Sequence, residues 1–323
     1  MNFLKTSKLK SDKRIQAWDF VNSIEGPSIL ITAGVHGGEN TPVEVALKVI
    51  ECLKKYKIKG NVTIIPIVNP DGYLKGTRLN PVDKKNINAS GNVNGKSSSE
   101  DTVSDDIANE LLKISRKYDY VIDLHSGSIN RYLPHVYFCS LEHKELARYF
   151  GLNFAIYHRT TNNHIQAGYS HRNNIPIFVR ACNTKTTTFG LELGAGHVVY
   201  KEDVEIGVRC IFSFLNKVGL LSVNKVLRKT SLRQVFEKAR DDIMTVIRAP
   251  YAGVIHYTKN LGELFHSDEV IAYIIDSATF QRKPIYSPID GRIVLQRIQS
   301  NLSAEEINCA VVARLIPCDN KLT

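Results

Sequence analysis

Residues 28–53 read SILITAGVHGGENTPVEVALKVIECL, and this stretch decides the fold class. Its first part, SILITAG, has the length and composition of a buried strand. Beyond the glycines, apolar side chains recur at helical spacing. Thr41, Pro42 and Glu44 are residue types favoured at the N-cap, the first and the third position of a helix. The stretch therefore predicts a strand, a glycine-rich loop and a capped helix.

The same alternation continues through the first two-thirds of the chain. Further buried strands are predicted in four apolar runs, at 61–70, 118–125, 175–180 and 187–194. Helices are predicted at about 104–117 and 202–217, whereas the polar stretch 82–103 reads as a long loop. Strands that alternate with helices predict an α/β fold, in which a sheet is flanked by helices.

The sequence changes character after about residue 245. APYAGVIHY (249–257) is echoed by SPIDGRIVL (287–295), with proline and glycine at matching places 38 residues apart. Each copy leads into a second strand-like run. We therefore expect a domain at 1–230 and an all-β domain of two pseudo-repeated halves at 245–323, joined by 231–244.

Composition restricts the partners and the location of the protein. Hydrophobic residues make up 43% of the chain, and the net charge of +10 favours anionic partners. The basic residues are scattered and lack interleaved aromatic residues, so nucleic-acid binding is not expected. No apolar run approaches the roughly 20 residues of a membrane span. The polar N-terminus and six cysteines without a CxxC pair predict a cytoplasmic protein. The oligomeric state stays open, a homo-oligomer included.

Three residues form a candidate metal site. His36 and Glu39 lie in the loop after the first strand, and His125 directly follows another strand. Ligands bind at the carboxyl ends of strands in open α/β sheets, so the three side chains converge if these strands are neighbours. Two histidines and a glutamate with an open fourth position are typical of catalytic zinc. Alone, His36 and Glu39 would be interpreted as ordinary polar loop residues.

Three further residues have both a functional and an ordinary interpretation. Glu192 interrupts an apolar strand, where it suits a general base or an ion pair with an arginine. Arg78 follows a Pro-Asp-Gly turn and suits a donor to a substrate carbonyl, or is simply exposed. Asp123 either orients a ligand or ends a strand as a polar residue.

Four motifs together resemble the succinylglutamate desuccinylase/aspartoacylase family. They are GVHGGE, NPDGYLKGTRLNPVDKKNIN, VIDLHSG and TFGLELG, in the order seen in that family. The resemblance implies a zinc hydrolase with a carboxypeptidase-A-like fold. It places the zinc ligands on His36, Glu39 and His125, the general base on Glu192, and the carbonyl-polarising role on Arg78.

The resemblance breaks at the residue after Asn88. The family pairs this asparagine with an arginine that holds a substrate carboxylate, but this chain has Ala89. Another cation could replace it, with Arg180 as the first candidate and Arg131 and Arg159 as weaker ones. A substrate without that carboxylate is the equal alternative.

The C-terminal part resembles a lipoyl/biotinyl-type hybrid fold. Residues 277–286 contain Lys283 but no lipoyl or biotinyl attachment motif, so a carrier role is not expected.

These features lead us to expect one Zn²⁺ per chain and a hydrolase that deacylates a small anionic or N-acylated, amino-acid-like substrate. A metallocarboxypeptidase acting on peptide C-termini is the alternative within enzymes. A non-catalytic metal-binding protein is the alternative of another class. It would need a fourth protein ligand, for which His135, His164 and His171 are candidates.

Overall fold

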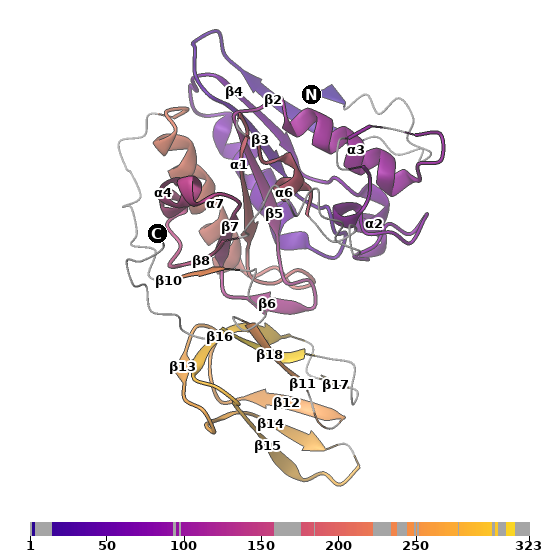
Figure 1. The fold of residues 1–323 in the computed structure, drawn as a ribbon, viewed down its shortest axis with the longest axis vertical. Coiled ribbons are helices and arrows are strands. Elements are labelled where there is room, and N and C mark those ends of the chain that lie inside the picture. The colour runs from indigo at the N-terminus through magenta and orange to yellow at the C-terminus, as the bar shows by residue number, and fades with distance from the viewer. Residues whose placement is uncertain are drawn as a thin grey trace.

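The structure is a computed structural model (Figure 1). It describes residues 2–3, 15–92, 95–96, 98–157, 176–183, 185–221, 234–237, 244–248, 250, 252–276, 278–298, 301–302 and 308–313. The predicted residues Arg159, His164 and His171 lie outside these ranges.

A nine-stranded mixed sheet forms the larger part of the molecule. Its strands, in spatial order, are β1 (Asn2–Phe3), β2 (Gln16–Val21), β4 (Asn61–Ile65), β3 (Ser28–Thr32), β5 (Tyr120–His125), β9 (Thr187–Glu192), β7 (His135–Phe138), β8 (Phe154–Tyr157) and β10 (Gln234–Glu237). The central strands β4, β3, β5 and β9 are all parallel, so their carboxyl ends meet at one edge. The strands that lead to His36 and His125 are therefore neighbours, which is the condition for their side chains to converge.

Helices cover both faces of this sheet. Figure 1 shows α1 (Asn40–Leu53) and α7 (Lys201–Lys217) on one face, and α3 (Val103–Ser115) with α6 (Ile177–Ala181) on the other. A hydrophobic core lies between the sheet and each layer of helices. Successive side chains of β3 alternate between these cores: Ile29 and Ile31 pack on the side of α1 and α7, and Leu30 packs on the side of α3. The remaining short helices are α2 (Pro70–Lys75), η1 (Ile87–Ala89), η2 (Leu141–His143), α4 (Lys144–Ala147) and η3 (Arg148–Phe150).

The C-terminal part contains two small sheets with a core of their own. One has β11 (Met244–Arg248), β18 (Asn308–Ala313), β16 (Gly291–Arg297) and β13 (Leu264–Phe265); the other has β15 (Arg282–Tyr286), β14 (Val270–Asp276), β12 (Gly253–Tyr257) and β17 (Asn301–Leu302). The repeat in the sequence has a structural counterpart, because β12 pairs antiparallel with β14 as β16 does with β18.

One strand joins the two parts. β6 (Asn130–Tyr132) belongs by sequence to the larger part, but it pairs antiparallel with β16, so that Tyr132 lies opposite Leu295. Apolar side chains from both parts, among them Phe154, Ile156 and Leu295, pack together beside this pairing. The backbone NH of Tyr132 also donates to the carbonyl of Gly194, at 3.1 Å. The small sheet is thus attached to the large one by main-chain hydrogen bonds as well as by apolar contact.

Three local predictions were wrong. A strand was predicted at 175–180, but residues 177–180 lie in helix α6, and an apolar run this short fits either state. Thr41 is not the N-cap, because α1 begins at Asn40 and its N-cap is Glu39, whose carboxylate contacts histidines instead of the helix. The expected turn before Arg78 is helix α2, capped by the side chain of Asn69.

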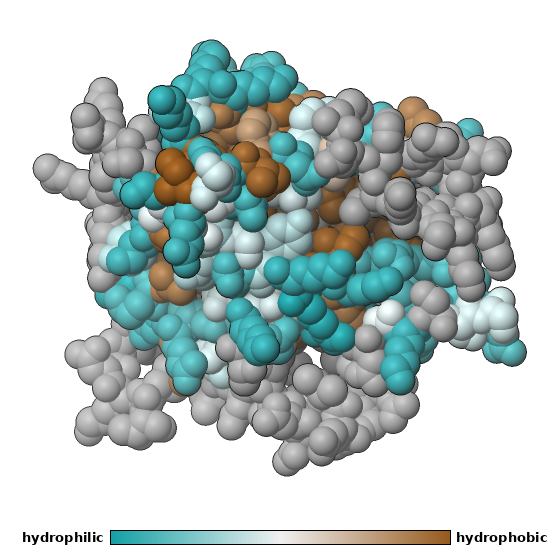
Figure 2. Space-filling view, turned by 90° about the horizontal axis from the view of Figure 1, so that it is seen from above, coloured by the Kyte–Doolittle hydropathy of each residue, from teal (hydrophilic) through white to brown (hydrophobic). Residues whose placement is uncertain are grey.

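The face seen in Figure 2 is mostly hydrophilic, with separate small hydrophobic patches. Within the described part of the chain, no helix combines the length and the hydrophobicity that a membrane span requires.

Candidate metal centre

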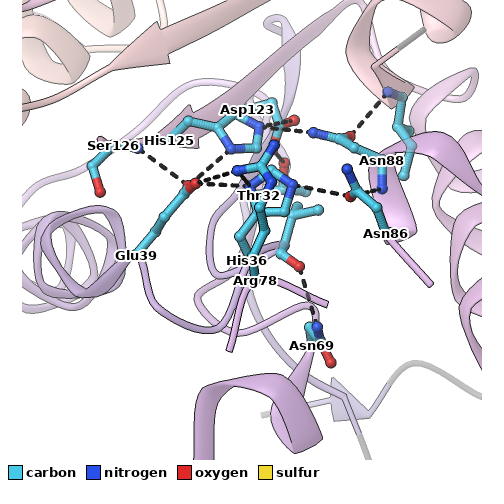
Figure 3. Close-up of polar contacts among 12 residues, drawn as sticks. Thr32, His36, Glu39, Asn69, Arg78, Asn86, Asn88, Asp123, His125 and Ser126 are labelled. Carbon is cyan, nitrogen blue, oxygen red and sulfur yellow. Dashed lines mark hydrogen bonds and ion pairs between the residues drawn. The ribbon is translucent and has the colours of Figure 1, made fainter. Parts of the chain in front are cut away.

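His36, Glu39 and His125 converge at the carboxyl edge of the large sheet (Figure 3). The first two come from the loop between β3 and α1, and His125 is the last residue of β5. One potential ligand atom from each residue lies within 4.8 Å of the others, and all three side chains are buried. These three residues form the candidate metal centre.

Both imidazoles present the same nitrogen to the glutamate. Nδ1 of His36 lies 2.8 Å from Oε1 of Glu39, and Nδ1 of His125 lies 3.0 Å from its Oε2. The other nitrogens donate to protein acceptors: Nε2 of His36 to Asn86 Oδ1 at 3.0 Å, and Nε2 of His125 to Asp123 Oδ2 at 2.8 Å. A proton held on Nε2 leaves the Nδ1 lone pair for a metal.

Burial and charge act against each other at this centre. Burial would raise the pKa of Glu39, but the neighbouring imidazoles of His36 and His125 lower it well below its usual value. Burial would lower the pKa of His125, but the carboxylates of Asp123 and Glu39 raise it well above its usual value. A proton on His125 therefore helps to balance the buried carboxylates of Asp123 and Glu39, as a cation between the two Nδ1 atoms would.

Residues around the three candidate ligands fix their orientation. Thr32 Oγ1 donates to Asp123 Oδ1 at 2.6 Å, so the carboxylate that accepts from His125 is itself held. The backbone NH of Ser126 donates to Glu39 Oε2 at 3.2 Å. On the opposite side, Nδ2 of Asn88 lies 3.3 Å from Nε2 of His125.

A glycine allows the loop that carries His36 to approach α2. A Cβ at Gly37 would overlap the backbone of Gly72, so only glycine fits there. Gly37 and Gly38 do not adopt positive φ, so a left-handed turn does not require glycine at either position. Close packing against α2 is therefore the reason for glycine at position 37.

The candidate metal centre opens into a cavity of about 640 Å³. The cavity is lined, besides the three candidate ligands, by Arg78, Asn86, Asn88, Ala89, Ser126, Gly127, Ser128, Ile129, Asn130, Tyr132, Tyr137, Pro176, Phe178 and Glu192. Glu192 ends β9 directly opposite His125 in the pairing of β5 with β9. Nη1 of Arg78 lies 3.4 Å from Glu39 Oε1, and its side chain is 55% exposed. The candidate base and the candidate carbonyl donor thus share the cavity with the metal centre.

The cations considered as replacements for the expected arginine lie elsewhere. Arg180 is not among the lining residues; its guanidinium donates to the carbonyls of Asn88 and Gly91, at 3.3 and 3.5 Å. Burial lowers the pKa of Arg180 to about 10. Arg131 forms ion pairs with Glu202 and Asp203. Arg180 therefore contacts the loop that holds Asn88 from outside the cavity.

Several residues of the site were not predicted from the sequence. Asn86 accepts from His36, and Tyr132, Tyr137 and Phe178 line the cavity. The histidines could be predicted because each follows a predicted strand. Asn86, Tyr132, Tyr137 and Phe178 do not, because they reach the cavity from a loop, from β6, from within β7 and from α6. His135, a candidate fourth ligand, directs Nδ1 to the carbonyl of Leu133 at 2.7 Å.

A family model for the catalytic domain of succinylglutamate desuccinylase/aspartoacylase matches residues 25–218. This match covers more than half of the chain and includes every predicted site residue. The chain belongs to this family. The predicted resemblance is therefore confirmed, and membership supports an enzyme of the amino-acid deacylase class.

Known proteins also align over most of the chain. N-alpha-acetyl-L-2,4-diaminobutyric acid deacetylase from Halomonas elongata is 26% identical over 302 residues, which cover 90% of this chain and 83% of the relative. Two solved structures share the fold. The product-bound ectoine utilization protein EutE (DoeB) from Ruegeria pomeroyi has a TM-score of 0.74 at 17% identity and covers 93% of this chain and 89% of its own. Succinylglutamate desuccinylase/aspartoacylase from Rhodobacter sphaeroides has a TM-score of 0.68 at 21% identity, with 94% and 90% covered.

Proposed function

We propose that this protein is a zinc-dependent hydrolase that removes the acyl group from a small N-acylated amino acid. The observation that carries the proposal is the convergence of His36, Glu39 and His125 in a cavity that also contains Glu192 and Arg78. Two imidazole nitrogens and one carboxylate oxygen suit zinc, and three protein ligands leave a position for water. When bound, zinc would supply a nucleophilic water at neutral pH and polarise a carbonyl.

The chain's own residues would carry the proton transfers. Glu192 would accept a proton from the attacking water and later give it to the leaving amine. Arg78, which reaches the metal centre from an exposed position, would donate to the carbonyl oxygen as negative charge develops there. Asn88, beside His125, would position the substrate.

We further propose that the acyl group is small and uncharged, with acetyl as the first candidate. The relative from Halomonas elongata is named as a deacetylase of an N-acetylated diamino acid. Ala89 lines the cavity at the position where the family has an arginine, and its uncharged side chain cannot pair with a carboxylate of the substrate. A panel of N-acetyl, N-succinyl and N-acyl-aspartyl substrates tests this choice. We expect the N-acetyl amino acids to have the highest kcat/KM, and a preference for N-succinyl substrates would refute it.

Metal analysis combined with a Glu192→Gln variant tests the reaction itself. We expect the purified protein to contain about one zinc per chain. The variant should retain the metal but lose on the order of 10²–10⁴-fold in kcat, because the amide cannot accept the proton. Glu205→Gln, on the exposed side of α7, is the matched control and should be fully active.

Two outcomes would refute the proposed function. One is full activity of Glu192→Gln with zinc bound. The other is a metal held by four protein ligands, measured by X-ray absorption, because a closed site is typical of structural zinc.

A further inference from the structure

The cavity wall includes one strand that belongs to the small C-terminal sheet. β6 follows the loop after His125, and its residues Asn130 and Tyr132 both line the cavity. Figure 1 places β6 at the junction, next to β16. Tyr132 lies opposite Leu295 in that pairing, and its backbone NH donates to Gly194, two residues after Glu192. The position of Tyr132 is therefore fixed from both sheets.

Tyr132 lines the same cavity as Glu192, Glu39 and Arg78. The charges that act on it are the carboxylates of Glu192 and Glu39 and the guanidinium of Arg78. Its ring is fixed by an edge contact with the ring of His135, with a centroid distance of 5.6 Å. Within the described part of the structure, no side chain or carbonyl hydrogen-bonds to its hydroxyl.

This hydroxyl remains a donor over the working pH range. Burial, followed by the carboxylates of Glu192 and Glu39, raises the pKa of Tyr132 above its usual value. Because Tyr132 lines the cavity, a ligand bound there can accept a hydrogen bond from this hydroxyl.

We propose that Tyr132 is a catalytic residue whose hydroxyl donates a hydrogen bond to the carbonyl oxygen of the bound N-acyl substrate. The donation strengthens as that oxygen gains negative charge, so it lowers the barrier more than it improves substrate binding. The inference rests on the proposed deacylase function. It also gives the C-terminal part a role in the reaction, because β16 holds the strand that carries this donor.

A Tyr132→Phe variant tests this inference, because it removes only the hydroxyl oxygen. We expect kcat to fall by about 10²-fold with little change in KM, as for the loss of one oxyanion donor. The melting temperature and zinc content should stay at the wild-type values. A phosphonate analogue of the tetrahedral state should bind about 10²-fold more weakly in calorimetry, whereas the free amino-acid product should bind as before.

Tyr120→Phe provides the matched control. Tyr120 begins β5, at the end of the strand opposite His125, and its ring packs on Phe214. This variant loses the same atom and should keep wild-type kcat and analogue affinity.

The inference is overturned if Tyr132→Phe keeps more than half of the wild-type kcat. It is also overturned if the variant loses zinc or stability, because the hydroxyl would then be structural. If Tyr132→Phe is active while Glu192→Gln is inactive, only this inference fails. An active Glu192→Gln variant would instead refute the proposed function.

Discussion

The carboxylate of Asp123 is shared between two partners at the centre of the site. One oxygen accepts from Thr32 and the other accepts from His125. Because Thr32 ends β3 and Asp123 lies opposite it on β5, the pairing of two strands sets the direction of the imidazole. The orientation of a candidate ligand is thus determined by the sheet rather than by its own loop.

Loss of the Asp123 carboxylate should therefore weaken metal binding. For Asp123→Ala we expect zinc affinity to fall by about 10–100-fold, the usual effect of removing a hydrogen-bond partner of a ligating histidine. Competition with a chromogenic chelator measures this. Asp119→Ala is the control, because Asp119 contacts Ser28 near the start of β3. Equal affinities of Asp123→Ala and wild type would contradict the expectation.

At the scale of single residues, the sequence predicted those side chains that follow strands. His125 and Glu192 end neighbouring parallel strands, so their meeting follows from sheet geometry alone. Asn86 and Tyr132 could not be found this way. Asn86 lies in an irregular loop, and Tyr132 depends on a pairing with β16 more than 150 residues later in the chain. A single sequence carries no local signal for such a contact.

At the scale of elements, helix α3 anchors the loop that carries Asn86 and Asn88. Asp105, in the first turn of α3, accepts from the backbone NH groups of Gly91 and Thr102, at 2.8 and 3.1 Å. It also pairs with Lys85 at 2.8 Å. Lys85 and Gly91 flank the two asparagines, so one carboxylate fixes both ends of the segment that contacts the histidines.

This anchor predicts a pH-dependent loss of stability in Asp105→Asn. Although burial opposes it, hydrogen bonds from Lys85, Gly91 and Thr102 lower the pKa of Asp105 from 3.8 to about 2. The ionised carboxylate therefore contributes fully above about pH 4–5, and its contribution fades as the pH falls towards 2. We expect the variant to lose about 0.5–2 kcal/mol in the free energy of unfolding at pH 7, the range for a helix cap.

Denaturant unfolding at pH 7 and near pH 2.5 measures this effect. The difference in the free energy of unfolding between wild type and Asp105→Asn should be smaller at the lower pH. An equal difference at both pH values would contradict the proposed role of the Asp105 carboxylate. Glu110→Gln, on the same helix with a looser pair to Lys113 at 3.5 Å, should change stability little at pH 7.

The long periodic helices and the central strands were predicted well, whereas the short helix α6 was not. Helices α1, α3 and α7 and strands β3, β4, β5 and β9 lie within about two residues of expectation, apart from the overlong 61–70 run. Helix α6 has only five residues, and its apolar sequence is compatible with a strand. Its helical state is set by tertiary contacts, including the bond from the backbone NH of Ile177 to Asn88.

At the scale of the whole molecule, the two parts share a boundary that does not follow the chain. β6 pairs into the small sheet, and β10, inside the segment predicted to be a linker, pairs with β8 in the large one. Burial of Phe154, Ile156 and Leu295 at this boundary adds apolar stabilisation.

A chain that ends at residue 243 should therefore be inactive, although it keeps every candidate ligand and Glu192. Loss of β16 would leave Tyr132 unpaired and expose the apolar cluster around Phe154. We expect low soluble yield and a kcat reduced by at least as much as in Tyr132→Phe. Soluble yield and turnover of purified protein check this. Wild-type turnover of the shortened chain would show that the small sheets are dispensable.

The pairing of β6 with β16 also matters to anyone who recombines this protein with its relatives. A chimera that exchanges only residues 244–313 replaces β16, the strand with which Asn130 and Tyr132 pair. The protein that supplies the exchanged segment would thus influence the shape of the cavity, even when every residue facing the substrate comes from the other protein. A chimera should therefore exchange residues 130–132 together with the C-terminal sheets. These two segments are separate in the sequence but adjacent in the structure.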